Sequence, residues 1–221
     1  MPAYVNNNYF SEQNANMAYI IGFLSADGNV SKKGNRIQSQ LSIKDKNHLE
    51  KIQKEIGGCE VYEYESNGYK SCGWYCYSAQ IKKDLADYGV IPNKTGTISI
   101  PKKLNKKYWR DFIRGYFDGD GSIHKDGTGF RTDITSANKE ILEDIDSFFV
   151  ENGIKHSNLM KDHNNMCIRY RSQASIDIYN LLYYDGCLCL DRKKNKFLEL
   201  IKEKYNSTRL RNFPKEVEKI C

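Results

Sequence analysis

The feature that most constrains this chain is an internal repeat. Residues 20–28, with the sequence IIGFLSADG, align with residues 113–121, with the sequence IRGYFDGDG, at an offset of 93 positions (113 − 20 = 93). Both glycines coincide, as does the Asp-Gly pair that ends each segment. The same offset pairs Ile37 with Phe130, Leu41 with Ile134, Leu49 with Leu142, Ile52 with Ile145 and Tyr77 with Tyr170. A constant offset held over about 60 positions predicts two related halves in one chain.

Each half shows the same order of predicted elements: helix, hairpin, helix, hairpin and helix. Two apolar segments with helical spacing end at Asp27 and Asp120, each followed by glycine. In the next strands, Ile37, Leu41 and Ile43 face one side, and polar residues face the other. The other predicted helices are residues 45–56, 79–88, 138–150, 174–184 and 191–204, and the second hairpins turn at 67–68 and 163–165. We divide the chain into an N-terminal extension (1–13), a first repeat (14–100), a linker (101–108), a second repeat (109–204) and a C-terminal tail (205–221).

The composition excludes several classes of protein. The 221 residues carry a formal net charge of +6 (34 − 28), which permits a polyanionic partner, and the chain is long enough to bury a core. The longest apolar stretch, residues 17–24, is far shorter than the roughly 20 residues of a membrane span. We find no secretory signal at the start of the sequence. The seven cysteines lack zinc-binding spacing, so we expect reduced thiols in a cytosol-like compartment.

Small residues in the repeated segments predict a close contact between two helices. Gly22 and Ala26 are four positions apart, as are Gly115 and Gly119. This spacing places each pair on one helix face, where small residues allow two backbones to approach closely. We therefore expect the two segments to pair along a pseudo-twofold axis.

This pairing would bring Asp27 and Asp120 together at the C-terminal ends of the helices. The two carboxylates repel each other, and the negative ends of the helix dipoles strengthen the repulsion, so a cation must compensate. Oxygen ligands favour a hard divalent cation, with Mg²⁺ as the first choice. Such cations activate water and stabilise both oxygens of a phosphodiester displacement. The two acids thus predict metal-dependent hydrolysis of a phosphodiester.

The segments AYIIGFLSADG and FIRGYFDGDG resemble the two signature motifs of the LAGLIDADG homing endonucleases in their single-chain, two-repeat form. The resemblance covers residues 14–204. It implies an α+β fold in which two pseudo-symmetric αββαββα halves form a saddle of antiparallel sheets over a DNA duplex. It also implies that Asp27 and Asp120 bind the metal, with the backbone carbonyls of Ala26 and Gly119 completing its shell. Mg²⁺ or Mn²⁺ would support cutting, and Ca²⁺ would be a non-catalytic substitute.

The resemblance further implies lysines near the scissile phosphates. Lys44, at a strand-to-helix junction, and Lys94, in the sequence GVIPNK, resemble basic positions of the family. The counterpart of Lys94 in the second half is Lys193 or Lys194, and the gapped alignment does not choose between them. Lys44 has no such counterpart, because the offset places Ala137 there.

One motif position departs from the family. Ser25 stands where the family usually has an acid and where the second half has Asp118. This position does not bind the metal in the family, so we expect activity to survive the difference and the site to be asymmetric.

Polar residues on the strand faces opposite the core are the candidates for reading bases, because two β-strands fit the major groove. Arg pairs bidentately with guanine and Gln with adenine, and Asp accepts from cytosine. The candidates are Arg36, Gln38, Gln40, Arg131, Asp133, Arg169 and Arg171. Lysines, including Lys193 and Lys194, would contact phosphates and supply most of the sequence-independent affinity. The two halves differ, which predicts a long, non-palindromic target, whereas Trp74, Tyr75 and Tyr77 are expected to pack in the core and the sheet.

These residues lead us to expect a monomeric endonuclease that cuts both strands of double-stranded DNA. Asp27 and Asp120 would act with Lys44 and Lys94 in catalysis. We expect no membrane association and no obligate protein partner. The expected location is the cytoplasm or nucleoid of a bacterium or phage-infected cell, or an organelle matrix, without secretion. Two alternatives stay open: an RNA maturase that assists intron splicing, and a catalytically inactive DNA-binding regulator on the same fold.

Overall fold

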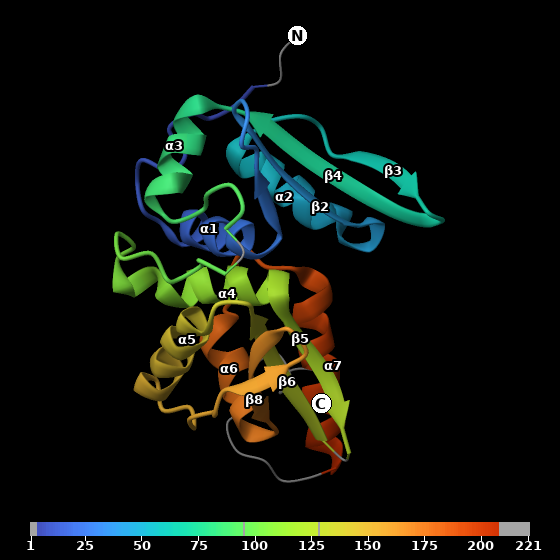
Figure 1. The fold of residues 1–221 in the computed structure, drawn as a ribbon. Coiled ribbons are helices and arrows are strands. Elements are labelled where there is room, and N and C mark those ends of the chain that lie inside the picture. The colour runs from blue at the N-terminus through green and yellow to red at the C-terminus, as the bar shows by residue number, and fades with distance from the viewer. Residues whose placement is uncertain (1–3, 95, 128, 208–221) are drawn as a thin grey trace. The chain divides into compact units, whose positions relative to one another are not determined.

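The computed structural model describes residues 4–94, 96–127 and 129–207. Residues 1–3 of the predicted N-terminal extension and residues 208–221 of the predicted tail lie outside the described residues. The chain forms two compact units (Figure 1). The first is Met1–Gly119 with Leu188–Leu190, and the second is Asp120–Cys187 with Asp191–Cys221. No helix among the described residues combines the length and the apolar composition that crossing a membrane requires.

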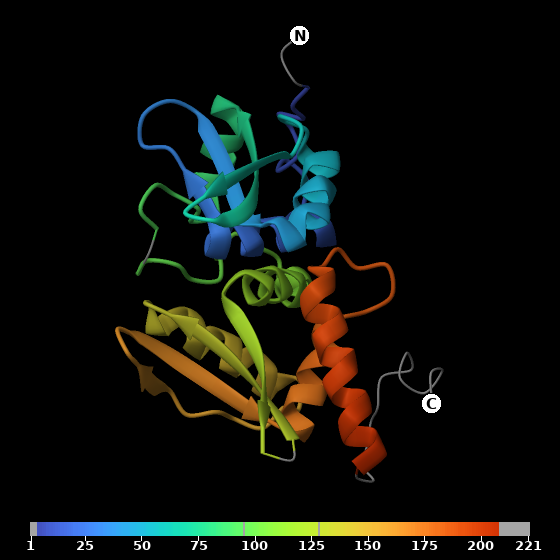
Figure 2. The same ribbon diagram turned by 90° about the vertical axis from the view of Figure 1, so that its right-hand side faces the viewer.

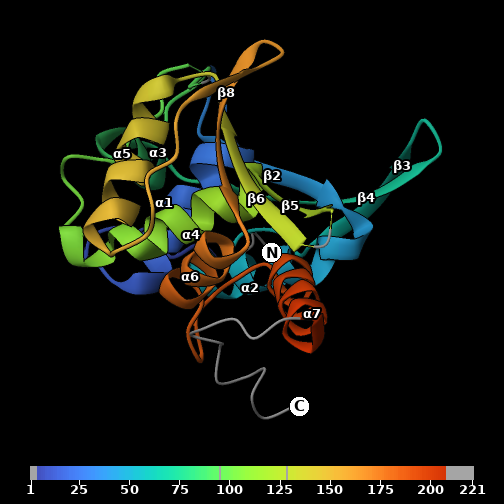
Figure 3. The same cartoon turned by 90° about the horizontal axis from the view of Figure 1, so that it is seen from below.

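The first unit contains a four-stranded antiparallel sheet in the order β1-β2-β4-β3. Its strands are β1 (Gly28–Val30), β2 (Arg36–Ser42), β3 (Tyr62–Ser66) and β4 (Tyr69–Tyr77). Its helices are α1 (Ala15–Asp27), α2 (Lys46–Ile56), α3 (Ala79–Asp87) and α4 (Trp109–Asp120), with the short 3₁₀ helices η1 (Ile43–Asp45) and η2 (Lys106–Tyr108). The tip of the β3–β4 hairpin extends beyond the rest of this unit (Figure 3).

The second unit repeats this topology with a sheet in the order β5-β6-β8-β7. Its strands are β5 (Gly121–Asp126), β6 (Gly129–Ser136), β7 (Met160–Asp162) and β8 (Asn165–Arg171). Its helices are α5 (Lys139–Glu151), α6 (Gln173–Leu182) and α7 (Asp191–Ser207), and α7 runs beside β5 and β6 (Figure 2). Two halves of the form αββαββα, followed by α7, confirm the predicted α+β fold class.

The period-two pattern of β2 sets the two faces of the first sheet. Ile37 and Ser39 are buried, whereas Gln40 is exposed, as expected for a sheet with one face on the core. The strand ends at Ser42, so Ile43, which we expected to continue the buried face, instead opens η1. The core under this sheet includes Leu49, Ile52 and Ile56 of α2. The opposite face is therefore left to polar and aromatic residues.

A buried carboxylate fixes the connection between α5 and β8 in the second unit. Asp146 accepts hydrogen bonds from the hydroxyl of Tyr170 at 2.6 Å and from the backbone N–H of Ser157 at 2.8 Å. It also lies 2.5 Å from Nδ1 of His156. The hydrogen bond and the negative charge of Asp146 raise the pKa of the exposed His156 above its ordinary value.

This pair predicts a pH-dependent contribution to stability. A raised histidine pKa in the folded state adds stability that is complete below the unfolded pKa of about 6.5 and is lost as the pH rises through the folded pKa. We expect the difference in free energy of unfolding between the wild type and His156→Gln to be larger at about pH 5.5 than at about pH 9. Urea unfolding at both pH values measures it, and an equal difference at both would contradict the prediction.

Candidate functional site

The helices α1 and α4 meet at two glycines. A Cβ atom added to Gly22 would lie less than 3.0 Å from the carbonyl oxygen of Phe112, and one added to Gly115 would lie less than 3.0 Å from that of Tyr19. Real Cβ atoms essentially never show such distances, so only glycine allows this contact. The close approach predicted from the small residues is therefore confirmed.

The same contact continues to the end of α1, where the first motif acid lies. A Cβ atom added to Gly119 would lie less than 3.0 Å from Cβ of Ala26 and 3.5 Å from Cγ of Asp27. The backbone of α4 therefore passes directly beside the Asp27 carboxylate. Asp27 is half-buried and is the last residue of α1, and its carbonyl oxygen accepts a hydrogen bond from Oγ of Ser39 at 3.2 Å.

Lys94 is held beside this acid. Its Nζ donates a hydrogen bond to the carbonyl oxygen of Gly28, the residue that follows Asp27. Lys94 lies in the connection that follows α3 and is half-buried. The structure thus binds the predicted site residue Lys94 to the backbone of the residue that follows Asp27. Lys44 is exposed in η1, between β2 and α2, and its catalytic role stays a prediction.

The second motif acid shows a related local arrangement within its own unit. Asp120 ends α4 and is exposed, and its carbonyl oxygen accepts a hydrogen bond from Oγ1 of Thr135 at 3.4 Å. A hydroxyl of the neighbouring strand thus binds the backbone of each acid, which anchors the ends of both motif helices. Near the start of α7, Lys193 is 7% exposed, whereas Lys194 is half-buried.

The position at which the two motifs differ has a packing role. Asp118 is 1% exposed and accepts hydrogen bonds from the hydroxyl of Tyr19 and from the backbone N–H of Leu190, both at 2.7 Å. The hydroxyl of Tyr19 also lies 3.2 Å from Nε2 of the buried His48. Ser25, in the equivalent position, donates to the carbonyl oxygen of Ile21 at 2.8 Å within its own helix. The two motifs therefore differ at this position in their buried hydrogen bonds: Asp118 binds other segments of the chain, whereas Ser25 binds only within its own helix.

We expect Asp118→Asn to lower the free energy of unfolding by about 2 kcal/mol. Both donors bind the same oxygen of Asp118, so the amide still offers them an acceptor but removes its negative charge. Hydrogen bonds to a charged group contribute about 1.5–3 kcal/mol each, against about 1 kcal/mol for neutral ones. Chemical denaturation measures the change. The control is Glu143→Gln, which alters an exposed pair with Lys139 and should change the free energy by less than about 0.5 kcal/mol. Equal effects of the two variants would contradict the prediction.

The sequence reasoning missed a short segment that joins the first unit from far along the chain. Besides the bond of Leu190 to Asp118, the carbonyl oxygen of Leu188 accepts from Nε of Arg114 at 2.9 Å. Arg114 is fully buried and pairs with Asp111 at 2.8 Å. Leu188–Leu190 therefore holds α4 through backbone groups, which leave no side-chain pattern for sequence analysis to detect.

The polar faces of the two sheets differ in chemistry. In the first, the guanidinium of Arg36 lies 4.4 Å from the ring centroid of Tyr75, which contacts the ring of Tyr77 at 5.5 Å. Trp74 is buried, as predicted, and its Nε1 donates to the carbonyl oxygen of Gly57 at 2.8 Å. Tyr77 is 62% exposed, so it packs against Tyr75 on the surface of the sheet and not in the core. It lies on the outer face because alternate residues of a strand point to opposite sides.

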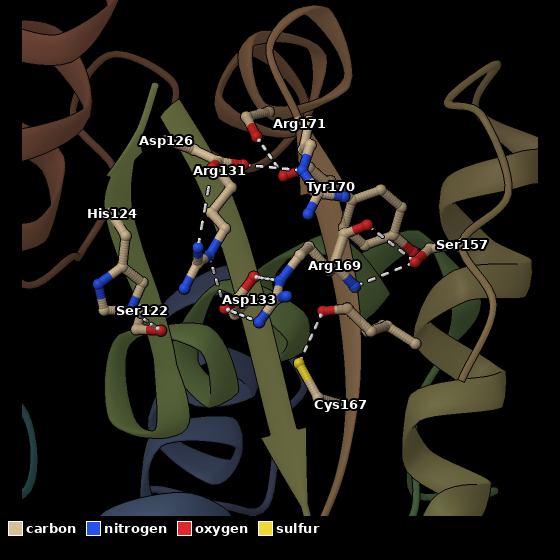
Figure 4. Close-up of polar contacts among 12 residues, drawn as sticks. Ser122, His124, Asp126, Arg131, Asp133, Ser157, Cys167, Arg169, Tyr170 and Arg171 are labelled. Carbon is tan, nitrogen blue, oxygen red and sulfur yellow. Dashed lines mark hydrogen bonds and ion pairs between the residues drawn. The ribbon is translucent and has the colours of Figure 1, made fainter. Parts of the chain in front are cut away.

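In the second sheet, the polar face carries ion pairs among the predicted DNA-reading residues. Asp133 accepts from Arg169 at 2.8 and 2.9 Å and from Arg131 at 3.2 Å (Figure 4). Arg171 donates to Asp126 at 2.8 Å, which lowers the pKa of that carboxyl below its ordinary value. The structure therefore brings together all four candidates of the second half. The candidates Gln38 and Gln40 lie on the first sheet, the former half-buried and the latter exposed.

The chain contains two repeats of the αββαββα form, and the glycine-bearing helices α1 and α4 each end at a motif acid. Residues 108–184 match the sequence model of a family described as the LAGLIDADG-like domain. The match covers most of the second repeat, and the first repeat shares the same αββαββα topology.

Solved structures share this fold at low sequence identity. The LAGLIDADG meganuclease I-AabMI bound to uncleaved DNA has a TM-score of 0.60 and 10% identity, covering 88% of this chain and 91% of that one. The LAGLIDADG homing endonuclease I-GzeII in complex with its DNA target has a TM-score of 0.58 and 16% identity, covering 95% and 97%. Full-length DUF199/WhiA of Thermotoga maritima has a TM-score of 0.59 and 13% identity, covering 97% and 69%. At these identities the likeness shows the fold alone.

The chain also resembles segments of longer proteins. The chain is 32% identical over 131 residues to the DNA-directed RNA polymerase subunit Rpo1C of Methanocaldococcus jannaschii, and 27% identical over 171 residues to an uncharacterized protein of the same organism. The matches cover 58% and 71% of this chain. The chain spans 15% and 60% of the length of these relatives.

Proposed function

We propose that this chain is a metal-dependent endonuclease that cuts both strands of a long, non-palindromic DNA duplex as a monomer. The observation that carries the proposal is the glycine contact between α1 and α4, which places the backbone of Gly119 beside the Asp27 carboxylate. Asp120 follows Gly119 directly in the chain. In this proposal both motif acids bind the cation, which would offset the repulsion between their carboxylates.

The residues present fit a hard divalent cation. The available donors are oxygens, namely the carboxylates of Asp27 and Asp120 and the carbonyl groups of Ala26 and Gly119. Mg²⁺ and Mn²⁺ prefer such ligands, and Ca²⁺ accepts them with longer, more flexible bonds. The absence of a side chain at Gly119 keeps its backbone accessible beside Asp27, which a Cβ atom would approach to 3.5 Å. When bound, the metal activates water and stabilises the negative charge that develops on the phosphate.

The chain itself contributes position and charge. Ser39 and Thr135 each donate a hydrogen bond to the backbone carbonyl of one acid, which supports the end of its motif helix. Lys94, bound to the carbonyl oxygen of Gly28, adds a positive charge beside Asp27. This charge favours binding of the phosphate and stabilises the additional negative charge of the transition state. Lys44 and one of Lys193 and Lys194 are weaker candidates for similar roles.

The sheets would supply recognition of the duplex. Two adjacent strands fit the major groove, and each polar face carries groups that bind base edges. The first face carries Gln and Tyr side chains with Arg36, whereas the second carries three arginines. The different faces favour a target without twofold symmetry. Two of the similar structures described above are complexes with DNA, which supports this reading.

A library of randomised duplexes, incubated with the protein and Mg²⁺, tests the proposed function. We expect one family of sequences to be cut on both strands, and we expect no cutting when the metal is chelated. Selective binding of a duplex without cutting under any divalent metal would support the inactive DNA-binding regulator instead. Binding of folded intron RNA in preference to every duplex would support the maturase.

A further inference from the structure

The strand register places charged residues of β6 and β8 side by side on the polar face of the second sheet. Asp133 is the partner of Arg169, and Arg131 is the partner of Arg171. The side chains of Asp133, Arg131 and Arg169 point toward one another (Figure 4). The equivalent pair in the first sheet is Gln40 and Gly73, so this cluster of charges belongs to the second half.

Asp133 is poorly placed to contact a base itself. Asp133 is 6% exposed, and both of its carboxylate oxygens already accept hydrogen bonds. Oδ1 accepts from Nε of Arg169 at 2.8 Å, and Oδ2 accepts from Nη2 of Arg169 at 2.9 Å and from Nε of Arg131 at 3.2 Å. A base amino group would have to break these charge-assisted bonds, which are about twice as strong as neutral ones. The role that we expected from sequence, an acceptor for cytosine, does not fit this geometry.

Arg169 is held at both ends. Its side chain forms the bidentate pair with Asp133, and its backbone is bound by Ser157, whose Oγ donates to the carbonyl oxygen at 2.9 Å and accepts from the N–H at 3.0 Å. Ser157 is itself bound through its N–H to the buried Asp146. Because the entropy of ordering Arg169 has already been lost, little of it opposes ligand binding.

The free edge of this guanidinium has the form that guanine requires. An arginine has five N–H donors, and Asp133 uses one on Nε and one on Nη2. Within the described residues, the Nη1–Nη2 edge is left for a ligand, and the side chain is 25% exposed. Two parallel donors on one edge match O6 and N7 of guanine in the major groove, which is the commonest specific contact of arginine with DNA.

We infer that Asp133 is a positioning residue that presents Arg169 to a single guanine in the target, on the side of the duplex bound by the second sheet. This inference rests on the proposed function, because it assumes that the sheet face binds duplex DNA. Arg171 differs, because its pair with Asp126 is exposed and holds it less firmly. The second half of the target should therefore contain one base pair that is discriminated much more strongly than its neighbours.

The experiment measures base preference at every position of the target. The wild-type protein selects a duplex from a randomised library in Ca²⁺, and affinities are then measured for all four bases at each position. The same panel is measured for Asp133→Asn, Arg169→Lys and the control Asp126→Asn. We expect the wild type to prefer guanine by about 10- to 100-fold at one position of the second half-site.

Both test variants should lose most of that preference at that position only. Lysine lacks the bidentate fork, and an amide in place of the Asp133 carboxylate cannot hold both donors of Arg169, whereas Asp126→Asn should leave this position unchanged. Arg169→Lys keeps the charge, so affinity for duplexes without the guanine should change by less than a few-fold. Thermal unfolding confirms that each variant is folded at the assay temperature.

Two results would overturn the inference in distinguishable ways. If the wild type selects no duplex sequence, the proposed function fails and the inference fails with it. If the wild type selects a site but both variants keep its base preferences, or lose affinity equally for all four bases, the proposed function stands and the inference alone is wrong.

Discussion

Asp120→Asn should abolish cutting of the selected duplex while its binding changes by less than a few-fold. The amide keeps the size of the side chain but removes the negative charge that the divalent cation requires. A metal at the reacting phosphate contributes several kcal/mol of transition-state stabilisation, so we expect the rate of cutting to fall by about a thousandfold or more. Single-turnover cleavage with Mg²⁺ measures the rate, and a filter-binding assay in Ca²⁺ measures the affinity. Asp27→Asn should behave in the same way.

The matched control is Asp118→Asn, two residues earlier in the same helix. Asp118 is buried and bonded to Tyr19 and Leu190, so its amide should lower stability and leave the cutting rate of the folded protein within a few-fold. The cutting assay must be run at a temperature below the unfolding transition of every variant. Unchanged cutting by Asp120→Asn would remove this residue from the chemistry, and equal loss in Asp118→Asn would point to folding instead of metal binding.

Gly115→Ala should lower the melting temperature by several degrees. Alanine is about 1 kcal/mol more favourable than glycine inside a helix, so local propensity alone predicts stabilisation. The added Cβ, however, would lie within 3.0 Å of the carbonyl oxygen of Tyr19, and the two helices must separate to admit it. Overpacking of this kind costs about 1–3 kcal/mol, which corresponds to roughly 2–12 °C in a protein of this size. Differential scanning calorimetry measures the change, and Gly22→Ala should act alike.

Gly129→Ala provides the control for the glycine prediction. Its added Cβ would lie 3.2 Å from Oγ of Ser172, a hydroxyl at the end of a short, rotatable side chain. We expect a change of less than about 0.5 kcal/mol. A rise in melting temperature for Gly115→Ala would show that the helix backbones are not in close contact.

The order of the elements could be predicted because it depends on local periodicity. A period of two in β2, a period of about 3.6 in α2 and the Asp-Gly pairs at the motif ends are visible in any short window of the chain. The repeat at an offset of 93 positions then showed that both halves have the same topology. The small residues Gly22 and Gly115 predicted the helix contact, because backbone approach requires the absence of a side chain.

The partners of the polar residues could not be predicted in this way. Asp133 was a candidate for base contact from its place on a polar strand face. Its two oxygens instead bind Arg169, its register partner in β8, and Arg131, two residues earlier in β6. Lys94 was a candidate through the family resemblance, and its contact with the backbone beside Asp27 depends on how the connection after α3 folds back.

The sequence by itself determined the repeat, the fold class, the glycine contact and the identity of the motif acids, because each follows from spacing along one segment. The tertiary structure alone decided that Asp118 is a buried hydrogen-bond acceptor, that Leu188–Leu190 binds the first unit, and that Asp133 holds Arg169. The physical reason is that these contacts join residues between 36 and 99 positions apart, through backbone groups and charges with no local periodic pattern.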